Sequence, residues 1–174
     1  KARDWLDARV PRSLMGFGLA PHSPYTVTGD LIGLLKSASG SRPFSIHAAE
    51  TPEEGEFLRR GKGPLLDLLL EAGVDMSGFE PPGLGPSPYL DRLGVLGGAL
   101  IVPAAALEPG DPALLRSRGA AVAFCPRSHS YFRRPPHPLP SLLEGGVPVA
   151  LGTDSALSNS GLSMGDEMRE VRRL

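Results

Sequence analysis

The segment PFSIHAAETPEE, residues 43–54, carries the clearest indication of the fold. A short β-branched and aromatic run ends abruptly at His47, and a carboxylate follows three residues later at Glu50. Buried strands of parallel sheets appear as short apolar runs. Polar side chains just beyond the carboxyl end of such a strand lie where α/β proteins bind their ligands. The segment therefore predicts a buried strand that opens onto a pocket.

Similar apolar runs recur along the chain and predict four more strands, at residues 14–21, 98–105, 120–126 and 148–154. Between them, spaced leucines with proline, glycine and capping signals predict helices. These helices cover residues 28–38, 63–73, 111–119, 139–146 and 162–174. Because strand and helix alternate, the class is α/β with a parallel sheet, either a (β/α)8 TIM-type barrel or an open doubly wound sheet.

Composition limits the partners and the compartment. The 174 residues suit one domain, and 18 basic against 19 acidic side chains give no electrostatic reason to bind nucleic acid or an anionic membrane. No apolar run approaches the roughly 20 residues of a membrane span. The single cysteine, Cys125, excludes an internal disulfide framework and fits a reducing compartment, so we expect a cytoplasmic protein. With Lys1 at its start, the chain looks like a piece of something longer.

Reactive side chains follow four of the five predicted strands. A lone histidine in such a place is usually a hydrogen-bonded structural residue, and a lone aspartate is often a helix N-cap. Here, however, they should converge, since the carboxyl ends of parallel strands share one edge. The residues are His22, His47 with Glu50, Arg127 with His129, and Asp154.

Two of these side chains suit a divalent metal. Imidazole and carboxylate are zinc ligands, and a catalytic zinc takes three protein ligands and a water. His47 and Asp154 would supply two of them, while Glu50 lies where it can carry a proton.

Other catalytic motifs are excluded. GEFLRRGKG (residues 55–63) has five residues between its glycines and no Ser or Thr after its lysine, so it is not a phosphate-binding loop. HAAE is not the H-x-E of zinc nucleobase deaminases, and one cysteine cannot form their C-x-x-C pair. No G-x-S-x-G elbow is present.

Four motifs taken together carry a family resemblance: PHSPYT (residues 21–26), HAAE (47–50), GAAVAFCPRSH (119–129) and GTDSALSNSGLSMGDEMR (152–169). They resemble the amidohydrolase superfamily, in its branch of hydrolytic deaminases and chlorohydrolases, over nearly the whole chain. The resemblance implies a (β/α)8 barrel, present here as a partial barrel of about strands four to eight. Residues 1–174 would then form one metal-dependent hydrolase domain that is incomplete at its N-terminus.

The resemblance also implies roles for individual residues. One divalent ion, Zn²⁺ or Fe²⁺, would be held by His47, Asp154 and a His-x-His pair that this sequence does not contain. Asp154 would also act as a base, Glu50 would protonate a ring nitrogen, and His22 would contact the substrate. The implied reaction is deamination or dechlorination of a purine-like or other heterocyclic amine by a metal-activated water. Such barrels often form homodimers.

One departure from the family pattern affects the pocket. The resemblance leads us to expect histidine after the sixth strand, but VPAAAL (residues 102–107) has Pro103 and Ala106 at those places. His129 is the candidate to compensate, and we place it with the substrate-binding residues. Arg127 is a candidate clamp for a substrate carboxylate or phosphate, with a structural ion pair as its alternative. His137, in RRPPHPLP, is expected in an exposed loop.

Two readings compete with an active hydrolase. The loss of the sixth-strand histidines favours an amidohydrolase-like scaffold without catalysis, which would bind a ligand or pair with another subunit. An open-sheet binding domain unrelated to the family is the third reading. Two further expectations are structural: Asn159 orders the loop after Asp154, and Cys125 is a small core residue.

Overall fold

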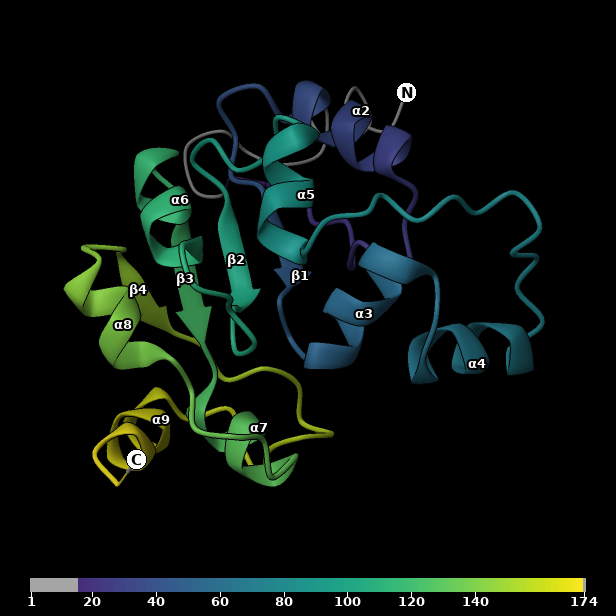
Figure 1. Cartoon of the computed structure of the whole chain (residues 1–174). Coiled ribbons are helices and arrows are strands. Elements are labelled where there is room, and N and C mark those ends of the chain that lie inside the picture. Colours follow the sequence, from purple (N-terminus) through teal and green to yellow (C-terminus); the bar gives the residue numbers. More distant parts are fainter. Residues whose placement is uncertain (1–15, 174) are drawn as a thin grey trace.

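A computed structural model describes residues 16–173, in which four parallel strands form one sheet in the order β1-β2-β3-β4. Each strand lies beside the strand that precedes it in the chain (Figure 1). The sheet confirms the parallel arrangement and four of the predicted strands. They are β1 (Ser45–Ala48), β2 (Leu100–Pro103), β3 (Ala121–Phe124) and β4 (Val149–Leu151).

The remaining predicted strand, residues 14–21, is reduced to a single parallel bridge between Leu19 and Phe44. Residues 14 and 15 lie outside the described part of the chain. The Leu19 N–H donates to the Pro43 carbonyl at 2.9 Å, so the segment does run beside β1. It cannot extend the ladder further because Pro21 has no N–H to donate.

The predicted helices are confirmed with slightly different ends, and three short ones were not predicted. Six of the eight helices have proline in the first turn, where the missing N–H costs no hydrogen bond. These positions account for part of the 19 prolines in the sequence. No helix within residues 16–173 is long and apolar enough to span a bilayer. The predicted helices are α2 (Gly29–Ser39), α4 (Pro64–Glu71), α6 (Asp111–Ser117), α8 (Leu139–Glu144) and α9 (Met164–Val171); the others are α3 (Pro52–Arg60), α5 (Pro86–Arg92) and α7 (Pro126–Tyr131).

The main core lies between one face of the sheet and four helices. Strand residues Ile46, Ile101 and Val122 are at most 1% exposed and belong to this cluster. Because successive side chains of a strand point to opposite faces, His47 lies on the face away from the core. Each of α2, α5, α6 and α8 contributes one fully buried side chain to the cluster: Ile32, Leu90, Leu115 and Leu142.

The carboxyl ends of the strands meet at one edge of the sheet. The arrowheads of β2 and β3 point toward the end where α7 lies (Figure 1). Three non-glycine residues just beyond strands have left-handed backbones: Ala49 (φ 51°), Ala104 (φ 56°) and Asp154 (φ 55°). Each costs about 1 kcal/mol, and such conformations concentrate at functional sites.

Candidate functional site

A pocket of about 270 Å³ opens at the carboxyl ends of the strands. It brings together most of the predicted site residues, although they are up to 132 residues apart in the chain, from position 22 to position 154. Convergent polar groups within a partly apolar wall are typical of a small-molecule site. The lining consists of His22, Tyr25, His47, Glu50, Val102, Pro103, Ala105, Cys125, Ser128, His129, Phe132, Arg134 and Asp154.

His47 is oriented by the backbone of the segment that precedes β1. Its Nδ1 lies 3.2 Å from the His22 carbonyl oxygen, which can only accept, so Nδ1 carries the proton and donates. The His47 backbone N–H donates to the same oxygen at 2.9 Å. This arrangement leaves Nε2 as the ring atom with a free lone pair. Metal-binding histidines are commonly oriented in this way, by donating their other ring N–H to a backbone carbonyl. The His22 ring lies close by, with 5.3 Å between the ring centroids.

Asp154 is fixed by two hydroxyl groups. Ser128 and Ser158 both donate to Oδ2, each at 2.6 Å. The Ser155 backbone N–H adds a hydrogen bond to the same carboxylate. Partial burial by itself would raise the pKa of Asp154, but these hydrogen bonds, with smaller help from His47, hold its pKa below the usual value. Aspartate tolerates the left-handed backbone at this position better than most residues do. The geometry therefore presents an ionised carboxylate at the wall of the pocket.

The loop that carries Asp154 is anchored to α9. Asn159 Nδ2 donates to the Thr153 carbonyl at 2.9 Å and to Glu167 Oε1 at 2.6 Å. Glu167 is fully buried, and its Oε2 accepts the Arg127 backbone N–H at 3.0 Å. The expectation that Asn159 orders this loop is therefore confirmed. Glu167 is the common acceptor that joins α7, α9 and the Asp154 loop.

Replacing Glu167 with alanine should destabilise this end of the sheet. The change leaves the Arg127 N–H and the Asn159 amide without their buried acceptor, which costs about 2 to 4 kcal/mol of unfolding free energy. Thermal unfolding of Glu167→Ala should show this loss, and Glu144→Ala, an exposed residue of α8, is the control. Equal melting temperatures for the two variants would contradict the anchoring role.

Arg127 lies outside the pocket, which corrects its prediction as a substrate clamp. Its guanidinium faces α9, 3.7 Å from Asp166 and 3.9 Å from Glu167, and donates to the Gly161 carbonyl at 3.1 Å. These contacts are the structural ion pair that was the alternative. The arginine that lines the pocket is a different one, Arg134.

The donor set fits part of a divalent-metal site. His47 Nε2 and Asp154 Oδ1 are suitable ligand atoms, and the two groups interact electrostatically. Among residues 16–173, no group of three or more His, Cys, Asp or Glu side chains has the arrangement of a metal site. The described residues thus offer two ligands, and further ligands would have to come from outside this set.

Glu50 is held at its backbone by a second glutamate. Its N–H donates to Glu54 Oε2 at 2.9 Å, while Thr51 caps α3 by accepting the Glu54 N–H at 3.3 Å. This is a variant of the capping box, and it fixes the turn between β1 and α3. Glu54 is fully buried, and burial raises its pKa to about 8, against the opposing effect of hydrogen bonds from the Glu50 and Ala49 backbone. Its Oε1 has no hydrogen-bond partner among the described residues.

Glu54 should give the protein a measurable pH dependence. The folded pKa of about 8 lies above the ordinary value of 4.5, so the folded state holds a proton that the unfolded state has released. The contribution of Glu54 to the free energy of unfolding is therefore largest below pH 4.5 and decreases as the pH rises toward 8. Melting curves across this range should show that Glu54→Gln removes part of the fall, whereas Glu53→Gln, an exposed neighbour, should not. Parallel curves for wild type and Glu54→Gln would contradict this.

His129 and His137 form a ring cluster beside Phe124. His129 lines the pocket, and its Nε2 lies 2.7 Å from the Pro135 carbonyl. His137 is only 8% exposed, stacks on Phe124 with ring centroids 3.8 Å apart, and donates from Nε2 to the Pro103 carbonyl at 2.8 Å. The expectation of an exposed His137 is therefore wrong. Burial lowers the pKa of both histidines, that of His137 to about 4.

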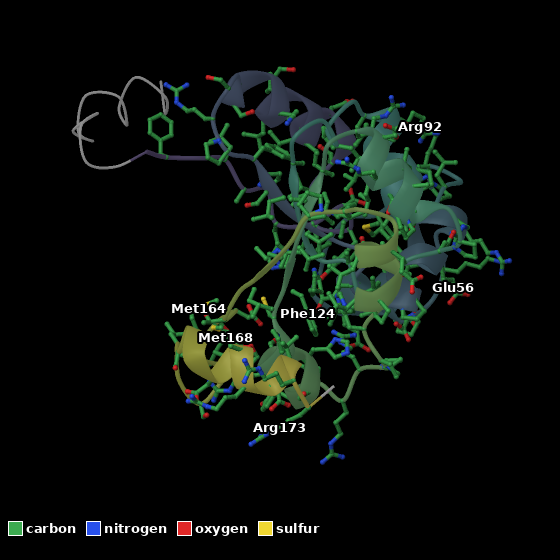
Figure 2. The ribbon with its side chains drawn as sticks, turned by 90° about the vertical axis from the view of Figure 1, so that its left-hand side faces the viewer. Glu56, Arg92, Phe124, Met164, Met168 and Arg173 are labelled. Carbon is green, nitrogen blue, oxygen red and sulfur yellow. The ribbon has the colours of Figure 1, made fainter. Side chains whose placement is uncertain are left out.

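Figure 2 labels Phe124 near the end of the sheet, whereas Met164 and Met168 lie further off, on α9. Phe124 is fully buried, and the two methionines are 45% and 55% exposed. The aromatic side chain thus forms the floor on which the histidine cluster packs. Pro103 lines the pocket beside this cluster, but Ala106 does not.

Several residues of the pocket were not predicted. A hydroxyl group carries no motif, so two donors to Asp154 were missed: Ser128, which lines the pocket, and Ser158, which is not part of its lining. Both lie within four residues of a predicted site residue. Arg134 was missed because nothing in the run FRRPP distinguishes it from Arg133. Cys125 was expected in the core and is 7% exposed at the pocket wall, where burial raises its pKa to about 11. Its thiol is therefore a poor nucleophile.

Comparison with known proteins relates almost the whole chain to one enzyme family. The model of the Amidohydrolase family matches residues 4–173. An aminodeoxyfutalosine deaminase of Deinococcus radiodurans is 38% identical over 175 residues, covering 95% of this chain and 42% of that protein. A 5-methylthioadenosine/S-adenosylhomocysteine deaminase of Pyrococcus furiosus is 32% identical, covering 92% of this chain and 34% of that protein. The chain thus spans less than half the length of each of these two relatives.

Solved structures share the fold. An adenosine deaminase from Xanthomonas campestris with bound zinc superposes with a TM-score of 0.76 at 26% identity, covering 98% of this chain and 35% of that one. Helicobacter pylori aminofutalosine deaminase gives a TM-score of 0.77 at 24% identity, covering 97% and 42%. These likenesses confirm the predicted fold class, a part of an α/β barrel.

Proposed function

The chain belongs to the amidohydrolase family, and on this premise we propose that it acts in a metal-dependent hydrolase that removes the amino group of a purine-like heterocycle. The observation that carries the proposal is the convergence of His47, Glu50 and Asp154 in one pocket at the strand ends. The named relatives are deaminases of adenosine-type or aminofutalosine-type compounds, which supports the same reaction class.

Two side chains would hold the metal. His47 through Nε2 and Asp154 through Oδ1 are the described ligands, and zinc is our choice because a structural relative is described with bound zinc. When bound, the ion would act as a Lewis acid that activates the attacking water. Iron(II) accepts the same ligand types, so the identity of the metal is for elemental analysis to decide.

Glu50 and Asp154 would divide the proton transfers between them. Hydrolysis adds water at the ring carbon that bears the amine and releases ammonia. Glu50 would carry one proton to the adjacent ring nitrogen, and Asp154 would accept the other from the water and return it to the leaving amine. The pKa of Asp154 is held low, so this carboxylate is ionised and ready to accept a proton near neutral pH.

The histidines would line the substrate side. His22 and His129 both face the pocket, and burial keeps the pKa of His129 low, so its ring is neutral near pH 7. A neutral imidazole can hydrogen-bond a heterocycle without adding charge. We propose His129 as the residue that serves in place of the histidine missing at Pro103. The alternative of a scaffold without catalysis draws no support from the relatives, all of which are named as enzymes.

The test is turnover of the purified, zinc-supplemented protein with 5'-deoxyadenosine, 5-methylthioadenosine and adenosine. We expect ammonia release in one-to-one proportion with the ultraviolet change from the amino to the oxo base for at least one of them. Substrate that disappears without ammonia, or no turnover of any aminopurine nucleoside while the metal is bound, would contradict the proposed reaction.

A further inference from the structure

A cation from a distant part of the chain lies against Glu50. Arg134 Nη2 donates to Glu50 Oε1 at 2.9 Å, although the two residues are 84 positions apart in sequence. The side chains are 25% and 27% exposed, so water screens this ion pair only in part. Among the described residues that line the pocket, Arg134 is the only arginine or lysine. Arg134 is thus paired with Glu50, the carboxylate to which the proposed function assigns proton transfer.

The turn at the end of α7 positions Arg134 beside Glu50. The Arg134 N–H donates to the His129 carbonyl at 3.3 Å, and the Arg133 N–H donates to the Ser130 carbonyl at 3.0 Å. With Arg133 in the left-handed region at φ 50°, this is a Schellman ending, in which glycine is the usual residue. The turn carries a backbone conformation that costs about 1 kcal/mol in a non-glycine residue. The Arg134 guanidinium also lies over the Phe132 ring, 5.4 Å from its centroid.

Glu50 is therefore held at two points. Glu54 fixes its backbone N–H, and Arg134 fixes one carboxylate oxygen. The other oxygen, Oε2, has no hydrogen-bond partner among the described residues and is the one left to carry a proton. A proton carrier depends steeply on geometry, since a misplacement of about 1 Å can cost about 100-fold in rate.

We infer that Arg134 is a positioning residue that fixes the Glu50 carboxylate for proton transfer. The inference rests on the proposed function for its kinetic consequence, but the contact itself does not. Arg134 neither gains nor loses a proton or a bond in this role. It differs from a substrate anchor, which would bind an anionic group of the substrate and act on KM.

The test compares Arg134→Gln with Arg133→Gln in the purified, zinc-supplemented protein. Arg133 is exposed, does not line the pocket and lies on the same turn, so its variant removes the same charge without touching Glu50. For Arg134→Gln we expect kcat to fall about 10- to 100-fold with little change in KM, and for Arg133→Gln no change. Arg134→Lys should recover part of kcat, because it keeps the charge but loses the planar fork.

A double variant separates positioning from a general loss of structure. If Arg134 acts only through Glu50, Arg134→Gln should add almost nothing to the loss already caused by Glu50→Gln. An unchanged kcat in Arg134→Gln, a rise in KM alone, or losses that multiply in the double variant would overturn the inference.

A spectroscopic measurement keeps the inference testable if the proposed function fails. In ¹⁵N NMR spectra, the Arg134 guanidinium signal should shift in Glu50→Gln and stay in place in Glu53→Gln, the exposed control on α3. A protein without turnover, in which the Arg134 signal still responds to Glu50→Gln, would contradict the proposed deaminase. It would leave the contact between Arg134 and Glu50 supported. An Arg134 guanidinium signal that does not shift in Glu50→Gln would overturn the inferred positioning role, whatever the activity.

Discussion

Replacing Asp154 with asparagine should remove both the metal and the activity. Asparagine accepts the left-handed backbone at φ 55° and can still accept hydrogen bonds from Ser128 and Ser158, so the loop should keep its shape. It lacks the negative charge that a divalent ion and a proton acceptor both need. We expect bound zinc to fall to a small fraction of the wild-type content and turnover to fall about 10³-fold or more.

The control for this variant is Asp166→Asn on α9. Asp166 is also an ionised carboxylate, whose pKa is lowered chiefly by its hydrogen bond from Arg169, but it does not line the pocket. Its replacement should leave metal content and turnover near wild type. A folded Asp154→Asn protein that keeps full metal and full turnover would remove Asp154 from the site.

Replacing Glu50 with glutamine should separate metal binding from proton transfer. Glutamine keeps the size of the side chain and the backbone hydrogen bond to Glu54, so the turn after β1 should persist. It has no proton to carry at pH 7, and general acid–base catalysis is worth about 10² to 10⁴ in rate. We expect Glu50→Gln to bind zinc as the wild type does and to lose turnover by about 10³-fold.

Metal analysis and kinetics on the same preparation make this prediction decisive. Glu53→Gln, one turn further on and exposed, is the matched control and should behave as wild type. Turnover retained in Glu50→Gln would end its role as the proton carrier. Loss of zinc together with turnover would place Glu50 among the metal ligands instead.

The elements that the sequence predicted are those whose local pattern agrees with their environment. The leucines of α2, α4 and α8 repeat at helical spacing, and the strands are short apolar runs buried by helices. The helix α3 was missed because only Phe57 and Leu58 are apolar within it, so its periodicity is weak. The helices α5 and α7 are 7 and 6 residues long and begin with proline, which also marks loops.

The site was predictable where a residue stands at a strand end. Glu50 and Asp154 follow the ends of parallel strands and His47 lies within one, and alternation along a strand is readable in sequence. His22 follows the segment that forms a single bridge to the residue before β1. Arg127 and His137 were misplaced because their partners come from other elements. Arg127 turns toward carboxylates of α9, and His137 is buried only because Phe124 and the Pro103 carbonyl receive it. Contacts of this kind depend on tertiary packing, and no periodic pattern in the sequence indicates them.

We propose that this pocket deaminates a purine-like heterocycle with the help of a bound metal. The most direct measurement follows ammonia release from an aminopurine nucleoside by the purified protein, first as isolated, then after a chelator, then after zinc is restored. We predict release that stops when the metal is removed and returns with zinc. Ammonia release that continues unchanged in the metal-free protein would contradict a metal-dependent reaction.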